Sequence, residues 1–178
     1  MRHKRGDVFV ETGCYRGDGV QAALDAGFTQ VITIELDRVN ADHVRQRFKG
    51  YPVTVIDGDT SMVLPRVLEN LHEPATFWLD AHPVQSTPIL MELTALAQHA
   101  IKTHTLLIDD RRLFGSVWMV GEDEVRAAVR VVNPEYIISY ADGYVKNDII
   151  VAQTSVASLA RYAGNVTSQA GEDGIVEF

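Results

Sequence analysis

The sequence contains little cysteine and no long apolar run. Cys14 is the single cysteine among 178 residues, so an intramolecular disulfide is excluded and a reducing cytoplasm is the expected location. No stretch approaches the roughly 18 apolar residues that a membrane span needs, so no membrane partner is expected. The basic start, MRHKRGD, runs into a strand-like segment and lacks the apolar region of a signal peptide.

Positive charge is also scarce. The chain has 16 Lys and Arg side chains against 24 acidic ones, a formal net charge of −8. Because nucleic-acid binding usually requires a basic patch, no nucleic-acid partner is expected. Composition is otherwise that of a globular protein, with 46% hydrophobic and 22% charged residues. A small-molecule ligand is therefore the favoured partner.

The length supports one domain with a substantial core. We assign residues 1–155 to it, and residues 156–178 to a C-terminal tail or extension, because they are rich in Ser, Gly, Ala and Asn and lack periodicity.

Short apolar runs alternate with helical segments along most of the chain. Strands are expected to begin at Asp7, Val31, Val53, Ala75 and Thr103, and helices at Gly19, Val39, Ser61, Thr87 and Gly121. Two further strands, residues 136–140 and 148–154, flank an Asp142-Gly143 turn signal and predict a hairpin. The pattern predicts an α/β fold, a Rossmann-like doubly wound sheet of seven strands, mostly parallel with a C-terminal antiparallel hairpin.

Three of the helices carry features typical of a helix start. Thr87 is the predicted N-cap of its helix, with Pro88 in the first helical position. Ser61 is a candidate cap for an earlier helix, and Pro65 is expected to delay the start of that helix or to bend it. The helix from Gly121 has acids in its first turn, which favours its dipole.

Acidic residues follow all five predicted parallel strands. Ligands of open α/β sheets bind outside the carboxyl ends of the strands, and buried charges are costly unless they are paired or coordinate a ligand. We therefore expect a functional rather than a structural reason for these acids. They are Glu11, Glu35, Asp37, Asp57, Asp59, Asp80, Asp109 and Asp110.

A glycine loop, Gly13-x-x-x-Gly17-x-Gly19, follows the first strand. Such a loop allows a ligand to approach a helix N-terminus closely, although many such loops are only tight turns. Its spacing differs from that of dinucleotide-binding loops, and Glu11 before it would repel a pyrophosphate but suit a positively charged ligand. Glu35, about 20 residues later, is placed to accept both hydroxyls of a ribose.

The order of elements, the ETGxxxGxG loop, Glu35 and the GDTxxxLP stretch resemble a class I S-adenosylmethionine-dependent methyltransferase. The resemblance covers residues 7–154, including the terminal hairpin. It implies S-adenosylmethionine as cofactor, with the methionine portion held by the first strand and its loop, the ribose by Glu35 and the adenine after the third strand. The residues implied in cofactor binding are Glu11, Thr12, Gly13, Gly17, Glu35, Asp59, Thr60 and Asp80.

Within that class, the acids after strands four and five resemble those of the metal-dependent small-molecule O-methyltransferases of the catechol and macrocin type. The resemblance implies a Mg²⁺ site formed by Asp80, Asp109 and Asp110, and three carboxylates suit that ion. In the alternative, Asp109 and Asp110 cap the following loop or pair with Arg111 and Arg112.

His82, two residues after Asp80, is the candidate catalytic base, and Asp80 is grouped with it as catalytic. His82 could instead bind the metal or hydrogen-bond a loop carbonyl. Phe114 and Trp118, after strand five, could line a substrate pocket or pack in the core.

The predicted function is methyl transfer from S-adenosylmethionine to a hydroxyl of a small molecule or sugar, with Mg²⁺ assistance left open. The main alternative is a non-catalytic methyltransferase-like domain that binds a nucleoside or a partner. The expected lack of a lid over the active site makes a homodimer a reasonable expectation.

Overall fold

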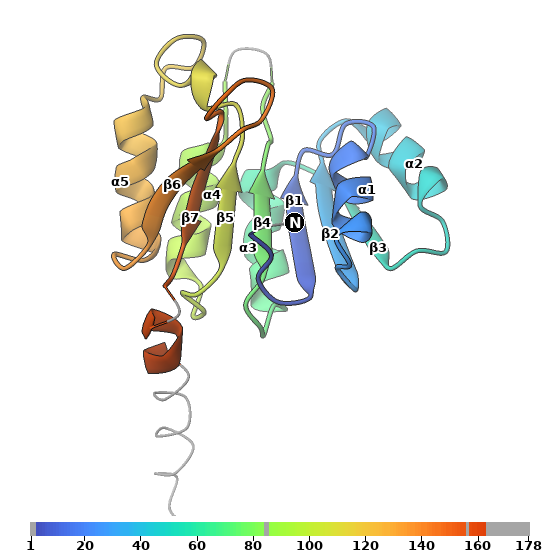
Figure 1. The fold of residues 1–178 in the computed structure, drawn as a ribbon. Helices are drawn as coiled ribbons and strands as arrows, with labels where there is room; N and C mark the ends of the chain where they lie inside the picture. Colours follow the sequence, from blue (N-terminus) through green and yellow to red (C-terminus); the bar gives the residue numbers. More distant parts are fainter. Residues whose placement is uncertain (1–2, 84–85, 156, 163–178) are drawn as a thin grey trace, which may run out of the picture.

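The computed structural model describes residues 3–83, 86–155 and 157–162. Its centre is a seven-stranded sheet of order β3-β2-β1-β4-β5-β7-β6 (Figure 1). Strands β1 to β5 are parallel, and β7 runs antiparallel between β5 and β6. The predicted fold class is confirmed. The strands are β1 (Val8–Thr12), β2 (Gln30–Glu35), β3 (Val53–Asp57), β4 (Thr76–Leu79), β5 (Thr105–Ile108), β6 (Ile137–Ala141) and β7 (Ile149–Gln153).

Helices cover both faces of this sheet. They are α1 (Asp18–Asp25), α2 (Arg38–Arg47), α3 (Thr60–Glu69), α4 (Ile89–Gln98) and α5 (Glu122–Val132), with a short 3₁₀ turn, η1 (Arg111–Leu113). Apolar side chains of α1 and α2 pack with one face of β1 and β2. Those of α3, α4 and α5 pack with the opposite face, in the larger core (Figure 1).

Burial on both faces explains why the strands read as continuous apolar runs. All five residues of β1 are buried, and so are all four of β5. Phe77, Leu64 and Ile108 are among the fully buried side chains. Each such side chain contributes about 1.5–3 kcal/mol by leaving water. This rigid layer fixes the positions of the strand ends.

Helix α3 starts differently from the prediction. Asp59, not Ser61, is its N-cap, and its Oδ1 accepts the Ser61 N–H at 2.9 Å and the Ser61 hydroxyl at 2.7 Å. The helix begins at Thr60 and includes Pro65, so the expected late start is wrong. The missing N–H of Pro65 removes one helical hydrogen bond without preventing the turns before it.

The start of α4 differs from the prediction by one residue. Pro88 occupies the N-cap position rather than the first helical position. Thr87 nevertheless satisfies a free helix donor, because its Oγ1 accepts the Ile89 N–H at 3.3 Å. The acids predicted in the first turn of α5 are present, and Glu124 Oε2 accepts the Gly121 N–H at 2.8 Å.

The terminal hairpin is closed by its own turn residues. Asp142 Oδ1 accepts the Asn147 N–H at 2.9 Å, and the Gly143 N–H donates to the Val145 carbonyl at 3.0 Å. Of the predicted tail, residues 157–162 are helical, whereas residue 156 and residues 163–178 lie outside the described part of the chain. Among the described residues, no helix is both long and apolar enough to cross a membrane.

Candidate active site

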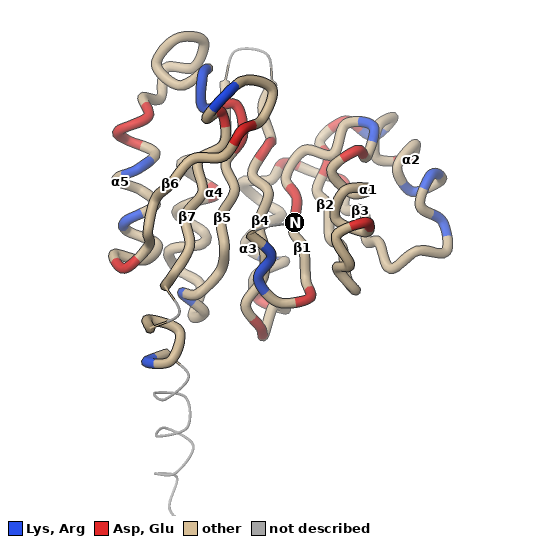
Figure 2. Tube along the Cα trace, in the orientation of Figure 1, with Lys and Arg blue, Asp and Glu red and all other residues tan. Residues whose placement is uncertain are grey.

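The carboxyl ends of the five parallel strands meet at one edge of the sheet. Thr12 pairs with Ile34 on one side and with Leu79 on the other, and Leu79 pairs with Ile108. Figure 2 shows acidic segments at these ends. The predicted site acids therefore lie along one edge, although they have different surroundings.

Glu35 holds the glycine loop in place. Its Oε2 accepts the backbone N–H groups of Cys14 at 3.0 Å and Tyr15 at 2.8 Å, and its Oε1 accepts the Asp37 N–H at 2.9 Å. The side chain is buried, so the carboxylate is fixed in orientation. Tyr15 and Gly17 adopt positive φ angles of 45° and 85°, which curl the loop around this carboxylate.

The glycines of the loop are required by close packing. A Cβ on Gly13 would lie 2.8 Å from the Asp80 carbonyl oxygen, and one on Gly19 would lie 1.9 Å from Glu11 Oε1. Gly13 thus lets the loop approach the end of β4, and Gly19 leaves room for the Glu11 carboxyl beside the start of α1. These contacts within the chain account for glycine at both positions.

Glu11 is a buried carboxyl in an acidic environment. Its side chain is 2% exposed, and its Oε2 accepts the Thr33 hydroxyl at 2.7 Å. Burial raises the pKa of Glu11 to about 8, and the negative charges of Asp80 and Glu35 add to that effect. Thr12 is fully buried, and its Oγ1 accepts the Asp80 N–H at 3.2 Å.

Several strand-end acids have structural partners, which corrects the expectation that all of them need a functional reason. Asp37 is the N-cap of α2, and its Oδ1 accepts the N–H groups of Val39 and Asn40 at 2.7 and 3.1 Å. Asp59 caps α3 in the same way. Asp57 pairs with Arg45. A residue that precedes a helix gains stability by accepting its free N–H groups, so capping explains Asp37 and Asp59.

Thr60, the other residue implied in adenine binding, is buried, and its Oγ1 has no hydrogen-bond partner among the described residues.

Asp80, His82 and Asp110 form a group at the ends of β4 and β5. His82 Nε2 lies 3.0 Å from Asp110 Oδ2 and 3.7 Å from Asp80 Oδ1. Burial raises the pKa of Asp80 to about 7, and the negative charges of Asp109 and Asp110 add to that effect, while a hydrogen bond from Trp78 opposes it. This group contains an imidazole next to acids, a combination that can transfer a proton.

A second acidic group lies on the β7 side and shares Asp110 with the first. Ligand atoms of Asp109, Asp110 and Asp148 lie within 4.8 Å of one another. The Nη1 of Arg112 contacts Asp110 Oδ1 at 2.7 Å and also contacts Asp148 Oδ2. The predicted set Asp80, Asp109 and Asp110 is therefore divided between two groups. The predicted pairing with arginine is confirmed for Arg112.

The backbone N–H of the neighbouring Arg111 donates to the Asp148 carbonyl at 2.8 Å, but its guanidinium has other partners. It pairs with Glu122 Oε2 at 2.9 Å and lies over the ring of Tyr140.

Sequence reasoning missed Asp148. Its side chain is fully buried, and its Oδ1 accepts the Arg112 N–H at 3.1 Å. Because β7 is antiparallel, the residue before it lies at the edge where β5 ends, as the pairing of Ile108 with Ile150 shows. The predicted hairpin could have indicated Asp148. An acid that precedes an antiparallel strand such as β7 lies at the same sheet edge as the acids that follow the neighbouring strand, β5.

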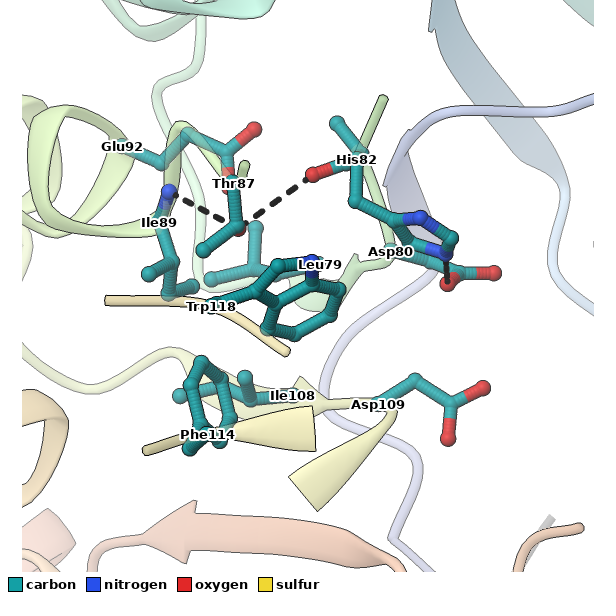
Figure 3. A pocket seen from close by; sticks show the side chains of 11 residues that line it. Leu79, Asp80, His82, Thr87, Ile89, Glu92, Ile108, Asp109, Phe114 and Trp118 are labelled. Carbon is teal, nitrogen blue, oxygen red and sulfur yellow. Dashed lines mark hydrogen bonds and ion pairs between the residues drawn. The ribbon is translucent and has the colours of Figure 1, made fainter. Parts of the chain in front are cut away.

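A small cavity of about 10 Å³ lies beside the first group (Figure 3). Trp118 and Phe114 line it and belong to the core, so the core explanation is confirmed and their place in a substrate pocket stays a prediction. The rings of His82 and Trp118 are 5.1 Å apart.

Glu92 also lines this cavity, and sequence reasoning missed it. It is 1% exposed, and its Oε1 has no hydrogen-bond partner among the described residues. Burial raises its pKa to about 7. The sequence could have indicated Glu92, because it is an acid on the apolar side of α4, between Ile89 and Leu96.

No protein-family model and no curated protein matches this sequence. Solved structures match its fold. An S-adenosylhomocysteine-bound methyltransferase of Podospora anserina, PaMTH1, is 14% identical and has a TM-score of 0.59; the match covers 84% of this chain and 72% of that one. The S-adenosylmethionine-bound amino pentose methyltransferase CalS10 of Micromonospora echinaspora is 13% identical, with a TM-score of 0.60 and coverage of 83% of each chain.

An O-methyltransferase of Bacillus cereus in complex with S-adenosylhomocysteine is 16% identical, with a TM-score of 0.60 and coverage of 86% of this chain and 76% of that one. At these identities the likeness establishes the fold, which is that of class I S-adenosylmethionine-dependent methyltransferases, as the sequence resemblance implied.

Proposed function

We propose that this chain, which has the fold of class I methyltransferases, transfers a methyl group from S-adenosylmethionine to a hydroxyl of a small molecule or sugar. The observation that carries the proposal is the carboxylate of Glu35, held by two amides of the glycine loop at the end of β2. It is buried, oriented and next to the point where the strand order reverses, between β1 and β4. In open α/β sheets that point is the ligand site.

The charge of the site fits this cofactor. S-adenosylmethionine carries positive charge on its sulfonium and amino groups, and Glu11 and Asp80 are buried acids whose pKa values are raised. A nearby cation would stabilise both carboxylates in their charged forms. Thr12, Gly13 and Gly17 would lie along the methionine portion.

Glu35 would accept the ribose hydroxyls, because a carboxylate has acceptor capacity beyond the three N–H groups that it already binds. Asp59 and Thr60, after β3, would lie next to the adenine.

His82 is the proposed base. A carboxylate only accepts hydrogen bonds, so the His82 Nε2 that faces Asp110 carries a hydrogen, and the neutral imidazole has its lone pair on Nδ1. When bound, S-adenosylmethionine supplies a methyl carbon attached to a positively charged sulfur. Nδ1 of His82 accepts the proton of the acceptor hydroxyl as its oxygen bonds to that carbon and the carbon–sulfur bond breaks. Asp110 stabilises the resulting imidazolium, and Asp80 lies near it.

Mg²⁺ does not fit the acidic residues as they are arranged. Both oxygens of Asp110, the acid common to the two groups, have partners: His82 on one side and Arg112 on the other. Mg²⁺ requires carboxylate oxygens at about 2.0–2.1 Å in near-octahedral geometry. The proposed transfer therefore relies on His82 and uses no metal. The cytoplasmic location and the homodimer stay predictions.

The test is calorimetric titration with S-adenosylhomocysteine. The wild type should bind it, and Glu35→Ala should bind it roughly 10–100-fold more weakly, because the variant loses charge-assisted hydrogen bonds to the ribose. Asp37→Ser, which replaces a neighbouring acid by another capping residue, is the matched control and should bind like the wild type.

Circular dichroism must show that Glu35→Ala is folded, and Glu35→Gln, which keeps the size of the side chain, supports the comparison. If the wild type produces no heat and no thermal shift with this ligand, the methyltransferase proposal is wrong. The non-catalytic binding domain would then become the better explanation.

A further inference from the structure

Three acids lie close together where β5 ends and β7 begins, and one arginine contacts two of them. Arg112 Nη1 contacts Asp110 Oδ1 at 2.7 Å and contacts Asp148 Oδ2, while the Arg112 backbone N–H donates to Asp148 Oδ1 at 3.1 Å. Arg112 thus binds both oxygens of Asp148, whose side chain is fully buried. Asp109 completes the group, and its buried Oδ1 has no hydrogen-bond partner among the described residues.

The backbone and a neighbouring ring hold this arrangement. Asp110 has a φ of 55°, a conformation that non-glycine residues rarely adopt, and it immediately precedes η1, which carries Arg112. The ring of Tyr144, from the β6–β7 loop, lies 5.0 Å from the Arg112 guanidinium. Contacts from both loops therefore keep the arginine among the acids.

The charge of this arginine is permanent. A guanidinium is not deprotonated in proteins, and its planar donors match carboxylates better than the ammonium of lysine does. A divalent ion bound by Asp110 and Asp148 would have to displace it from the same oxygens and would be repelled by it at short range. Because Asp110 belongs to both acidic groups, the one arginine affects each of them.

We propose that Arg112 is the resident cation of this acidic edge, bound to Asp110, which the sequence resemblance assigned to a Mg²⁺ site together with Asp80 and Asp109. The chain then binds no divalent ion at Asp109, Asp110 and Asp148, and removal of the guanidinium converts these three carboxylates into a divalent-cation site. This inference concerns occupancy by a cation and does not depend on the proposed methyl transfer.

The test is a Mn²⁺ titration monitored by electron paramagnetic resonance, in which bound ions lose the signal of free Mn²⁺. The wild type should bind no Mn²⁺ at this site. Arg112→Met should gain one Mn²⁺ per chain, at least about tenfold tighter than any binding by the wild type. Arg111→Met is the matched control, because Arg111 pairs with Glu122 instead, and it should gain nothing.

Two further variants make the result specific. Arg112→Lys keeps a positive charge and should remain without Mn²⁺, and Arg112→Met combined with Asp148→Asn should lose the new site. A folded Arg112→Met that gains no Mn²⁺ overturns the proposal. The proposal is also overturned if the wild type binds one Mn²⁺ and the Asp148→Asn variant does not. That comparison does not require Arg112→Met to fold. The titration with S-adenosylhomocysteine is separate, so failure of one proposal is distinguishable from failure of the other.

Discussion

The carboxyl edge of the sheet has two halves that use the same residue types differently. In the half formed by β1, β2 and β3, Glu35, Asp37 and Asp59 accept backbone N–H groups. In the half formed by β4, β5 and β7, acids face His82, Arg112 and one another. The first half organises loops and helix starts, and the second concentrates charge.

The difference has an electrostatic consequence. Backbone donors stabilise a carboxylate locally, whereas neighbouring acids raise the free energy of its charged form. Asp80, which follows β4 in the second half, illustrates the second case, because burial and the charges of Asp109 and Asp110 raise its pKa to about 7. Under the proposed function, the first half would bind the cofactor and the second would accept the proton.

The sharpest test of that division is His82→Gln. Methyl transfer should slow by roughly 10²–10⁴-fold, because the acceptor hydroxyl loses its base. Affinity for S-adenosylhomocysteine should not change, since Glu35, the proposed ribose ligand, lies in the other half. Release of S-adenosylhomocysteine with a panel of catechols and sugars measures the rate, and His43→Gln, at an exposed position on α2, is the control. An undiminished rate would remove His82 from the mechanism.

Glu92→Gln tests the cost of buried charge at this edge. The folded chain holds the Glu92 proton more tightly than the unfolded chain does, because its pKa is raised from 4.5 to about 7. The contribution of Glu92 to the free energy of unfolding is therefore fully present below pH 4.5 and is lost as pH rises through about 7. The wild type should therefore lose unfolding free energy between pH 5 and pH 8 as Glu92 ionises. Glu92→Gln, which never ionises, should lose about 2–3 kcal/mol less than the wild type over the same range.

Urea denaturation at pH 5, 6.5 and 8 measures this difference. Glu11 and Asp80 also have raised pKa values, so the pH dependence should decrease rather than disappear. Glu69→Gln, at an exposed position at the end of α3, should match the wild type. An equal pH dependence in wild type and Glu92→Gln would mean that Glu92 is not held protonated.

Asp37→Ala probes the first half and should have the smallest effect. The free energy of unfolding should fall by about 1 kcal/mol, because α2 loses the acceptor for the Val39 and Asn40 N–H groups. Asp37→Ser should retain most of that stability, and both variants should bind S-adenosylhomocysteine as the wild type does. A large loss of affinity in Asp37→Ser would place this acid in the cofactor site and weaken the contrast between the halves.

Much of this edge could be predicted from local sequence. The alternation of apolar runs and helical segments predicted seven strands and the hairpin, because strands buried on both faces must be apolar. The position of Glu35 at the end of the second strand was also correct. The start of α3 was not, because Asp59 and Ser61 are both good caps and only the backbone conformation selects between them.

The contacts of the second half could not be read from spacing. Arg112 lies 36 residues before Asp148 in the chain, and their contact exists because β7 returns antiparallel beside β5. The carboxyl of Glu92 is buried because α4 packs against both α3 and α5.

The sequence by itself determined which elements form and that acids follow each parallel strand, since periodicity and strand order along the chain are local properties. The tertiary structure decided which of those acids cap helices, which face one another and which meet an arginine. The physical reason is that the environment of a charge depends on groups brought within a few ångströms by sheet pairing and helix packing, and no local pattern specifies those neighbours.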